Sequence, residues 1–138
     1  MFSFLKNDSK MIGFQDVQIA IKNKNEYLIV NTLSIDEQKC LIVGTIDAKS
    51  EESLLNSMIN TFEQPDKKIV LYGKNSIDKS VDIKAKQLNK LGISDVFIYK
   101  GGLFEWMLLQ DIYGYDEFPT TMNVLDILLY KPNKVFDS

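Results

Sequence analysis

The sequence predicts an α/β fold whose sheet is parallel or mostly parallel and is covered by helices on both faces. Short apolar runs, typical of strands buried on both sides, alternate along the chain with segments of helical spacing. The clearest unit is residues 69–72, four apolar or aromatic side chains in a row, followed by a loop and a helix that ends before Gly92. Such alternation favours parallel strands, because a crossover helix must return the chain to the same edge of the sheet.

The N-terminal half is expected to contain two strands and two helices. Residues 1–10 end in a polar run and are interpreted as a flexible lead-in. Apolar spacing predicts a short helix over residues 14–21, and residues 27–31 and 41–46 are expected to form strands. A helix follows Ser50, its expected N-cap, with a core stripe made of Leu54, Leu55, Met58, Ile59 and Phe62.

The central part is expected to contain two further strands, residues 69–72 and 96–99, with a helix between them. That helix extends to Leu91, and its core face carries Ile77, Val81, Ala85 and Leu88. Backbone N–H groups of the loop that precedes the helix point toward one spot, as at other helix N-termini.

After about residue 107 the chain is interpreted as a C-terminal extension. The apolar helix predicted over residues 103–112 carries Trp106, which we expect in the core. Residues 113–119 are irregular, and their aromatic side chains either pack this segment down or face a partner. A last helix is predicted after Thr121, with Val124, Leu125 and Leu128 facing inward.

Length and composition describe a single globular domain, residues 11–138. The net charge of −3, with no basic cluster larger than a pair, argues against nucleic-acid binding. No apolar run is long enough to cross a bilayer and no signal-peptide pattern is seen, so we expect no membrane association and a cytoplasmic location. The single Cys40 excludes an internal disulfide, in keeping with a reducing compartment.

Two absences restrict the chemistry that the chain can perform. It has no histidine, which removes the usual general base and the commonest metal ligand. All sixteen cationic side chains are lysine, so no arginine can hold a phosphate in bidentate fashion. The sequence predicts no metal site and no cofactor.

Two stretches of the chain match the layout of a known family. Residues 96–106 run from a strand through Gly101 and Gly102 to Trp106, and residues 69–72 lead through a short loop, closed by Lys79 and Ser80, into a helix. Over about residues 11–106 the chain thereby resembles the rhodanese-like family. This resemblance implies a rhodanese-like fold with a five-stranded, mostly parallel sheet and helices on both faces.

The departures from the family's pattern decide the functional interpretation. By the resemblance, Gly73 stands where the family has its nucleophilic cysteine, Lys79 where it has an arginine, and Asn31 where it has an aspartate. The loop of seven residues, 73–79, matches the family's phosphatase-like branch. Sulfur transfer and phosphoester hydrolysis both require the cysteine thiolate, which glycine lacks. We therefore predict no catalytic residue at this loop.

The degenerate active-site loop is instead a predicted binding site, made of Gly73, Lys74, Asn75, Ser76, Ile77, Asp78, Lys79 and Ser80. Its N–H groups and lysines favour a small anion, or the lysines are simply solvated. The preferred interpretation is a catalytically inactive protein-binding or scaffold module that uses this loop and residues 113–119 to bind a protein partner. The alternative is a sulfurtransferase or phosphatase-like enzyme that uses Cys40 or a partner's thiol.

Overall fold

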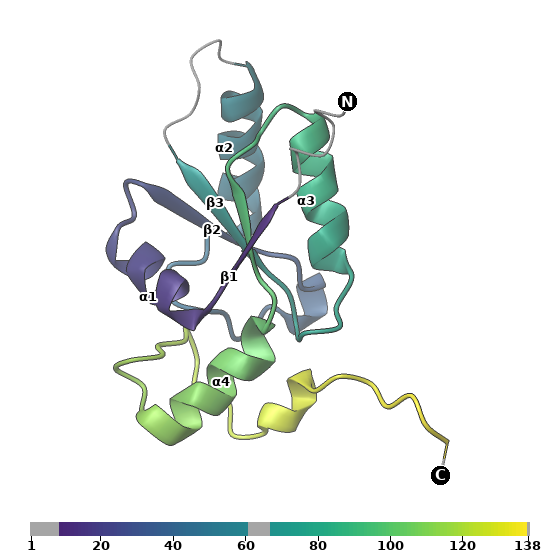
Figure 1. Cartoon of the computed structure of the whole chain (residues 1–138). Coiled ribbons are helices and arrows are strands. Elements are labelled where there is room, and N and C mark those ends of the chain that lie inside the picture. Colours follow the sequence, from purple (N-terminus) through teal and green to yellow (C-terminus); the bar gives the residue numbers. More distant parts are fainter. Residues whose placement is uncertain (1–8, 61–66, 138) are drawn as a thin grey trace.

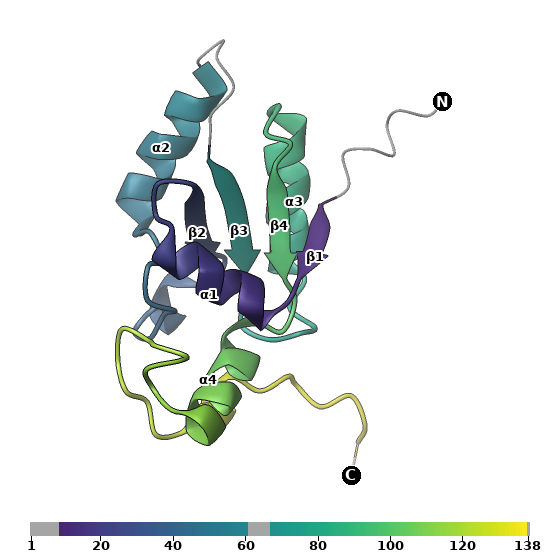
Figure 2. The same cartoon turned by 60° about the vertical axis from the view of Figure 1, so that its left-hand side comes forward.

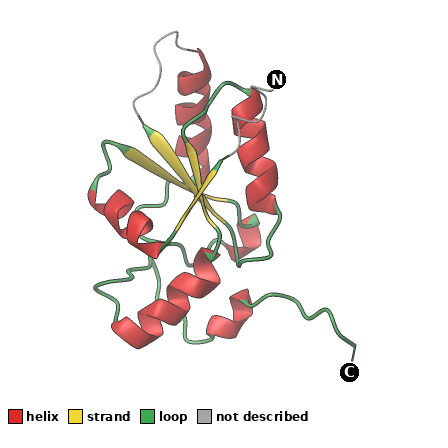
Figure 3. Cartoon of the chain, in the orientation of Figure 1, coloured by secondary structure: helices red, strands yellow, loops and turns green. Residues whose placement is uncertain are grey.

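The computed structural model describes residues 9–60 and 67–137, which form an α/β fold around a four-stranded parallel sheet (Figures 1 and 3). The strands are β1 (Lys10–Ile12), β2 (Tyr27–Asn31), β3 (Lys68–Tyr72) and β4 (Val96–Tyr99). Their spatial order is β1-β4-β3-β2, and all three pairings are parallel. The predicted α/β class is confirmed.

Helices cover both faces of this sheet (Figure 2). They are α1 (Phe14–Lys22), α2 (Ala48–Asn60), α3 (Ser80–Lys90) and α4 (Gly102–Tyr113), with 3-10 turns η2 (Ile35–Glu37) and η3 (Ile127–Tyr130). α1 and α4 share one core with the sheet, and α2 and α3 share the other. Within the described residues, no helix combines the length and the apolar character that a membrane span requires.

The two cores follow from the alternation of side chains along each strand. In β3, Val70 and Tyr72 point into the core shared with α1 and α4, whereas Ile69 and Leu71 point into the core shared with α2 and α3. All four side chains are buried, as the apolar run 69–72 predicts for a strand covered on both faces.

Trp106 and residues 113–119 explain how the C-terminal extension is attached. Trp106 is fully buried, which confirms its predicted core position, and its Nε1 donates a hydrogen bond to the Pro119 carbonyl (3.1 Å). Phe118 packs edge-on against the Trp106 ring and is also buried. Tyr113 and Tyr115 remain exposed, so only part of the predicted aromatic segment packs down.

The prediction of a strand at residues 41–46 is wrong, and the described sheet has four strands where the resemblance implied five. The segment instead turns at Gly44, whose φ of +93° is incompatible with a regular strand, and the Thr45 N–H donates to the Ile42 carbonyl (3.0 Å). It keeps only isolated bridges, from Thr45 to Ile29 and from Ile42 to Thr120.

The N-terminus adds a strand that the sequence analysis did not predict. β1 has only three residues, and the Met11 side chain is 61% exposed, so this strand lacks the buried apolar run that predicted the other strands. The lead-in predicted for residues 1–10 lies outside the described residues as far as residue 8, and Lys10 belongs to β1.

The structure also corrects several helix boundaries. Asp47, not Ser50, caps α2, because its carboxylate accepts from the Ser50 N–H (2.9 Å). α3 begins at Ser80, so Ile77 lies in the loop and not on the predicted helix face. Phe62 of the predicted α2 stripe lies outside the described residues.

The last helix predicted after Thr121 is not found as an α-helix among residues 121–137, which the structure describes. The Thr121 N–H donates to the Leu41 carbonyl (2.8 Å), and the Thr121 hydroxyl accepts from the Leu41 N–H (3.0 Å). The polar groups of Thr121 therefore bind the segment around Leu41 instead of capping a helix. Only the short η3 forms, and Leu125 and Leu128, predicted to face inward, are 91% and 59% exposed.

Candidate functional site

The loop 73–80 lies at the carboxyl end of β3, where open α/β sheets usually carry their sites. It borders an open concavity of about 500 Å³. The lining side chains come from the segment after β2, from the loop itself and from the C-terminal extension: Thr32, Leu33, Ser34, Glu37, Lys74, Asn75, Ile77, Asp78, Lys79, Ser80, Lys131 and Asn133. The predicted loop residues are therefore brought together around one hollow, with Gly73 and Ser76 outside its lining.

The carboxylate of Asp78 fills the inside of the loop. Its Oδ2 accepts a hydrogen bond from the Lys74 N–H (2.9 Å), and its Oδ1 accepts from the N–H (3.0 Å) and the hydroxyl (2.8 Å) of Ser80. Burial opposes ionisation of Asp78, but these hydrogen bonds outweigh it and hold the pKa of the carboxyl below its usual value. Two N–H groups at the predicted anion site thus already bind the chain's own carboxylate.

A side chain at Gly73 would require the Asp78 side chain to shift. A β-carbon at Gly73 would lie 2.7 Å from Asp78 Oδ2 and 3.2 Å from Thr32 Oγ1. The Thr32 and Ser80 hydroxyls are themselves hydrogen-bonded (2.7 Å). A carboxylate and two hydroxyls therefore form one connected group in front of Gly73, at the place that a side chain of residue 73 would occupy.

The beginning of α4 supports the loop from the other side. Gly102 has a φ of +69°, and a β-carbon there would lie 2.7 Å from the Gly73 carbonyl oxygen. The N–H groups of Leu103 and Phe104 donate to the carbonyls of Gly73 (3.0 Å) and Lys74 (2.9 Å). The second glycine of the Gly-Gly motif thus has a physical role, because it lets the helix N-terminus lie directly against the loop backbone.

The buried Asn75 joins the loop to the C-terminal extension. Its Nδ2 donates to the Tyr130 carbonyl (3.0 Å), and its Oδ1 accepts from the Ile77 N–H (3.2 Å). This contact brings Lys131 and Asn133 to the rim of the concavity. Sequence reasoning missed both residues, because nothing local signals a contact between positions 55 apart.

Residues 113–119, which the sequence analysis placed in the same binding surface as the loop, contact α1. Gln18 Nε2 donates to the Glu117 carbonyl (2.8 Å), and Phe118 packs against the Phe14 ring. This segment is not among the residues that line the concavity beside the loop.

The outer side of the loop carries mixed charge. Lys74 forms an ion pair with Glu37, and this bond is the main cause that lowers the pKa of the Glu37 carboxyl. Ser76, Ile77 and Lys79 are exposed at the tip. The loop therefore presents one apolar and one cationic side chain to solvent, while its inner polar groups bind one another.

Comparison with known proteins was made on both sequence and structure. The family model of the Rhodanese-like domain matches residues 10–109, which is more than half of the chain. This chain belongs to the rhodanese-like family. Functionally curated proteins give no match.

Several solved structures share the rhodanese-like fold. A full-length protein from Lactobacillus plantarum has 18% identity and a TM-score of 0.60, covering 82% of this chain and 88% of that protein. Saccharomyces cerevisiae Ygr203w, described as a homologue of single-domain rhodanese and of the Cdc25 phosphatase catalytic domain, has 13% identity, a TM-score of 0.58 and coverage of 86% and 91%. The single-domain sulfurtransferase RDL2 from Saccharomyces cerevisiae has 19% identity, a TM-score of 0.53 and coverage of 77% and 94%.

Cys40 lies in the core of this rhodanese-like domain. Its side chain is 0% exposed, and its thiol donates to the Met122 carbonyl (3.2 Å). Burial raises the pKa of the thiol, so the reactive thiolate is disfavoured.

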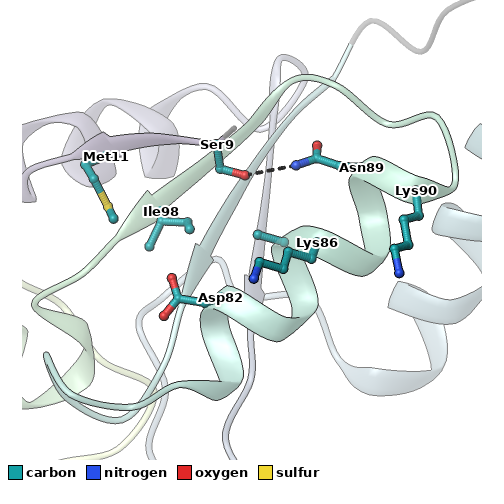
Figure 4. A pocket seen from close by; sticks show the side chains of 8 residues that line it. Ser9, Met11, Asp82, Lys86, Asn89, Lys90 and Ile98 are labelled. Carbon is teal, nitrogen blue, oxygen red and sulfur yellow. Dashed lines mark hydrogen bonds between the residues drawn. The ribbon is translucent and has the colours of Figure 1, made fainter. Parts of the chain in front are cut away.

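A second hollow, of about 390 Å³, lies between β1, β4 and α3 (Figure 4). Met11 and Ile98 supply apolar lining, and Asp82, Lys86 and Lys90 supply charges of both signs. The Asp82 carboxylate pairs with Lys100 (2.9 Å). The described residues that line this hollow include no cysteine, so it offers no alternative thiol for the family's chemistry.

Among residues 9–60 and 67–137, no three histidine, cysteine, aspartate or glutamate side chains gather around a position that a metal ion could occupy.

Proposed function

We propose that this rhodanese-like domain is catalytically inactive and acts as a protein-binding or scaffold module. The observation that carries the proposal is the loop 73–80 itself. Glycine stands at the position that the family resemblance assigns to the nucleophile, and the carboxylate of Asp78 occupies the space in front of it. Both changes oppose a thiolate at this site, because the nucleophile is missing and an anion already lies there.

The alternative, an enzyme that uses Cys40, is less well supported. A nucleophile must reach its substrate as a thiolate, whereas Cys40 is fully buried and its pKa is raised. A thiol supplied by a partner would have to enter the concavity beside Asp78, where its thiolate would meet a negative charge.

Turnover assays test this proposal directly. The wild-type chain and a Cys40→Ala variant should both lack measurable thiosulfate-to-cyanide sulfur transfer and measurable hydrolysis of an aryl phosphate. Turnover by the wild type that is lost in Cys40→Ala would overturn the proposal in favour of the enzyme.

A pair of variants separates the two features that oppose a thiolate at the loop, the missing cysteine and the Asp78 carboxylate. In Gly73→Cys, the new thiol lies against the Asp78 carboxylate, so we expect its pKa to rise above the ordinary value of about 8.5. In Gly73→Cys with Asp78→Ser, the Lys74 and Ser80 N–H groups are free to stabilise the thiolate, so its pKa should fall. The rate of iodoacetamide alkylation, followed against pH, measures the thiol pKa in both variants. The Asp78→Ser variant alone shows how much of the alkylation comes from Cys40.

A small anion at loop 73–80 remains a prediction, with Asp78 as its competitor. Sulfate or phosphate must displace this carboxylate to reach the same N–H groups. Titration of backbone amide shifts with sulfate at constant ionic strength should therefore show weaker saturation at the loop in the wild type than in Asp78→Ser. Equal affinities would mean that any anion binds elsewhere.

A further inference from the structure

Exposed apolar side chains concentrate in the C-terminal extension of the domain. Of seventeen large apolar side chains exposed among the described residues, ten lie between positions 108 and 136. They are Leu108, Ile112, Tyr113, Tyr115, Met122, Leu125, Leu128, Leu129, Val135 and Phe136. Isolated exposed apolar residues are ordinary, but contiguous exposed apolar patches mark interaction sites, so this concentration points to the C-terminal extension as a candidate interaction surface.

Up to residue 130, the charge of this region has one sign. Residues 101–130 contain five carboxylates and no lysine, although the whole chain has sixteen lysines. All five carboxylates are exposed: Glu105, Asp111, Asp116, Glu117 and Asp126. We refer to residues 108–129 as the acidic apolar face. Its composition fits a partner segment that combines an apolar side chain with positive charge.

The acidic apolar face borders a groove of about 360 Å³ beside α1. The groove is lined by Phe14, Gln18, Leu109, Tyr113, Glu117 and Phe118. Three aromatic rings and a leucine form its apolar part, and Glu117 supplies a carboxylate. A single aromatic side chain next to a cation would suit this lining.

Residues 131–137 carry that combination. Val135 and Phe136 are 84% and 85% exposed, and Lys134 precedes them. In an extended chain, alternate residues point to the same side, so Lys134 and Phe136 can face one surface together. Lys131 and Asn133 still line the concavity beside the loop 73–80, and the rest of the segment runs away from the body of the domain, on the side opposite α1 (Figure 1). It therefore does not approach the groove of its own chain.

We propose that residues 131–137 of one copy of this chain dock into the groove beside α1 of a second copy. Phe136 enters the aromatic lining, and Lys134 meets Glu117. A two-fold axis makes the exchange reciprocal, so that two segments fill two grooves and the assembly closes as a dimer. This proposal does not depend on whether the loop 73–80 binds a partner.

The mass of the full chain in solution tests the proposal. Sedimentation velocity across micromolar concentrations should show a dimer that weakens as salt is raised, since charge contributes to the contact. Phe136→Ser removes the aromatic anchor from both contacts and should weaken dimerisation about a hundredfold or more. Ile35→Ser is the matched control, because Ile35 is equally exposed (84%) but lies in η2, away from the groove.

Charge reversal gives the sharper test. Lys134→Glu and Glu117→Lys should each be monomeric alone, because like charges then face each other in both contacts of a homodimer. An equimolar mixture of the two variants should form a heterodimer, since both of its contacts pair opposite charges again. Circular dichroism should show both variants folded, because both side chains are exposed.

Three results would overturn the proposal. One is a wild-type chain that stays monomeric at every concentration. Another is a dimer that Phe136→Ser leaves as strong as the control Ile35→Ser does, which would place the contact on another surface. The third is a mixture of the charge-reversed variants that remains monomeric.

Discussion

The inner polar groups of the loop 73–80 are hydrogen-bonded within the molecule, whereas many side chains of the acidic apolar face are exposed to solvent. In the loop, backbone N–H groups, a carboxylate and hydroxyls bind one another, and α4 donates to its carbonyls. On the acidic apolar face, large apolar side chains and carboxylates of one sign remain exposed. The loop, where the resemblance places the family's chemistry, is thus closed by internal hydrogen bonds, while the acidic apolar face, which lies almost entirely beyond the family match, leaves apolar and acidic side chains exposed. We expect changes in the loop to alter folding stability and changes on the face to alter association.

The largest effect is expected for Gly102→Ala. Its β-carbon would meet backbone atoms of the loop, the Gly73 oxygen at 2.7 Å and the Asn75 nitrogen at 3.0 Å, and these cannot rotate away. Together with the strain of φ +69° this should cost about 2–5 kcal/mol of unfolding free energy in urea. Gly101→Ala is the control, because Gly101 has an ordinary φ of −59° and the atoms nearest to its added β-carbon belong to the flexible Glu105 side chain, not to backbone. Equal losses in both variants would show that α4 does not depend on this close approach.

Two buried tyrosines that lie opposite each other in the sheet, Tyr72 and Tyr99, give the next comparison. The Tyr72 hydroxyl accepts from the Ile42 N–H (3.1 Å) and bonds the Thr45 hydroxyl (2.7 Å). Tyr72→Phe leaves a buried N–H unpaired, so we expect a loss of about 1–3 kcal/mol. The Tyr99 hydroxyl makes no hydrogen bond of ordinary geometry among the described residues, although burial and the Glu105 carboxylate raise its pKa, so Tyr99→Phe should cost less than Tyr72→Phe. Thermal unfolding of both variants checks this, and a larger loss in Tyr99→Phe would contradict it.

The sequence predicted the parts of the fold in which local pattern and tertiary contacts agree. The apolar runs at 27–31, 69–72 and 96–99 are strands, and the spacing over 14–21 is helical. The failure at 41–46 has a local cause, since Gly44 turns a run that otherwise has strand composition. The missing helix after Thr121 has a distant cause, because Thr121 binds Leu41, eighty positions away.

The sequence predicted where the candidate site lies in the fold, but not how the side chains of the site are arranged. The strand, the loop and the Gly-Gly motif located residues 73–80 beside the carboxyl end of β3. That Asp78 turns inward, and not toward solvent as Lys79 does, depends on one side-chain rotamer and on donors from Lys74 and Ser80. Apolar periodicity carries no information on that choice.

Acid should weaken the loop through Asp78. Because its pKa is lower in the folded state than in the unfolded state, Asp78 contributes stability above its unfolded value of about 3.9 and loses it as the pH falls through the lower folded value. At neutral pH, Asp78→Asn should cost about 1 kcal/mol, since an amide places a donor against a backbone N–H. The difference from wild type should shrink below about pH 4. Urea titrations across pH measure it.

Asp82→Asn provides the control for this prediction. Asp82 lies in the first turn of α3, which follows the loop, but its bond is a surface ion pair with Lys100, so its removal should change stability by only a few tenths of a kcal/mol. A pH-independent difference between wild type and Asp78→Asn would mean that the carboxylate is not ionised inside the loop.

The smallest effect on folding is expected for Leu125→Ser, on the acidic apolar face. Helical spacing predicted that Leu125 faces the core, where such a change would cost about 2–5 kcal/mol, but the side chain is 91% exposed. In dilute solution the unfolding free energy should therefore change by less than about 0.5 kcal/mol, in contrast to Leu103→Ser, which removes a fully buried leucine. If a second copy covers Leu125, the gap between wild type and variant must grow with protein concentration, because association stabilises only the folded chain. Thermal unfolding at several protein concentrations measures this gap in stability. A constant gap near zero would mean that the dimer contact is confined to the groove, and a gap that grows would mean that the contact extends across the face.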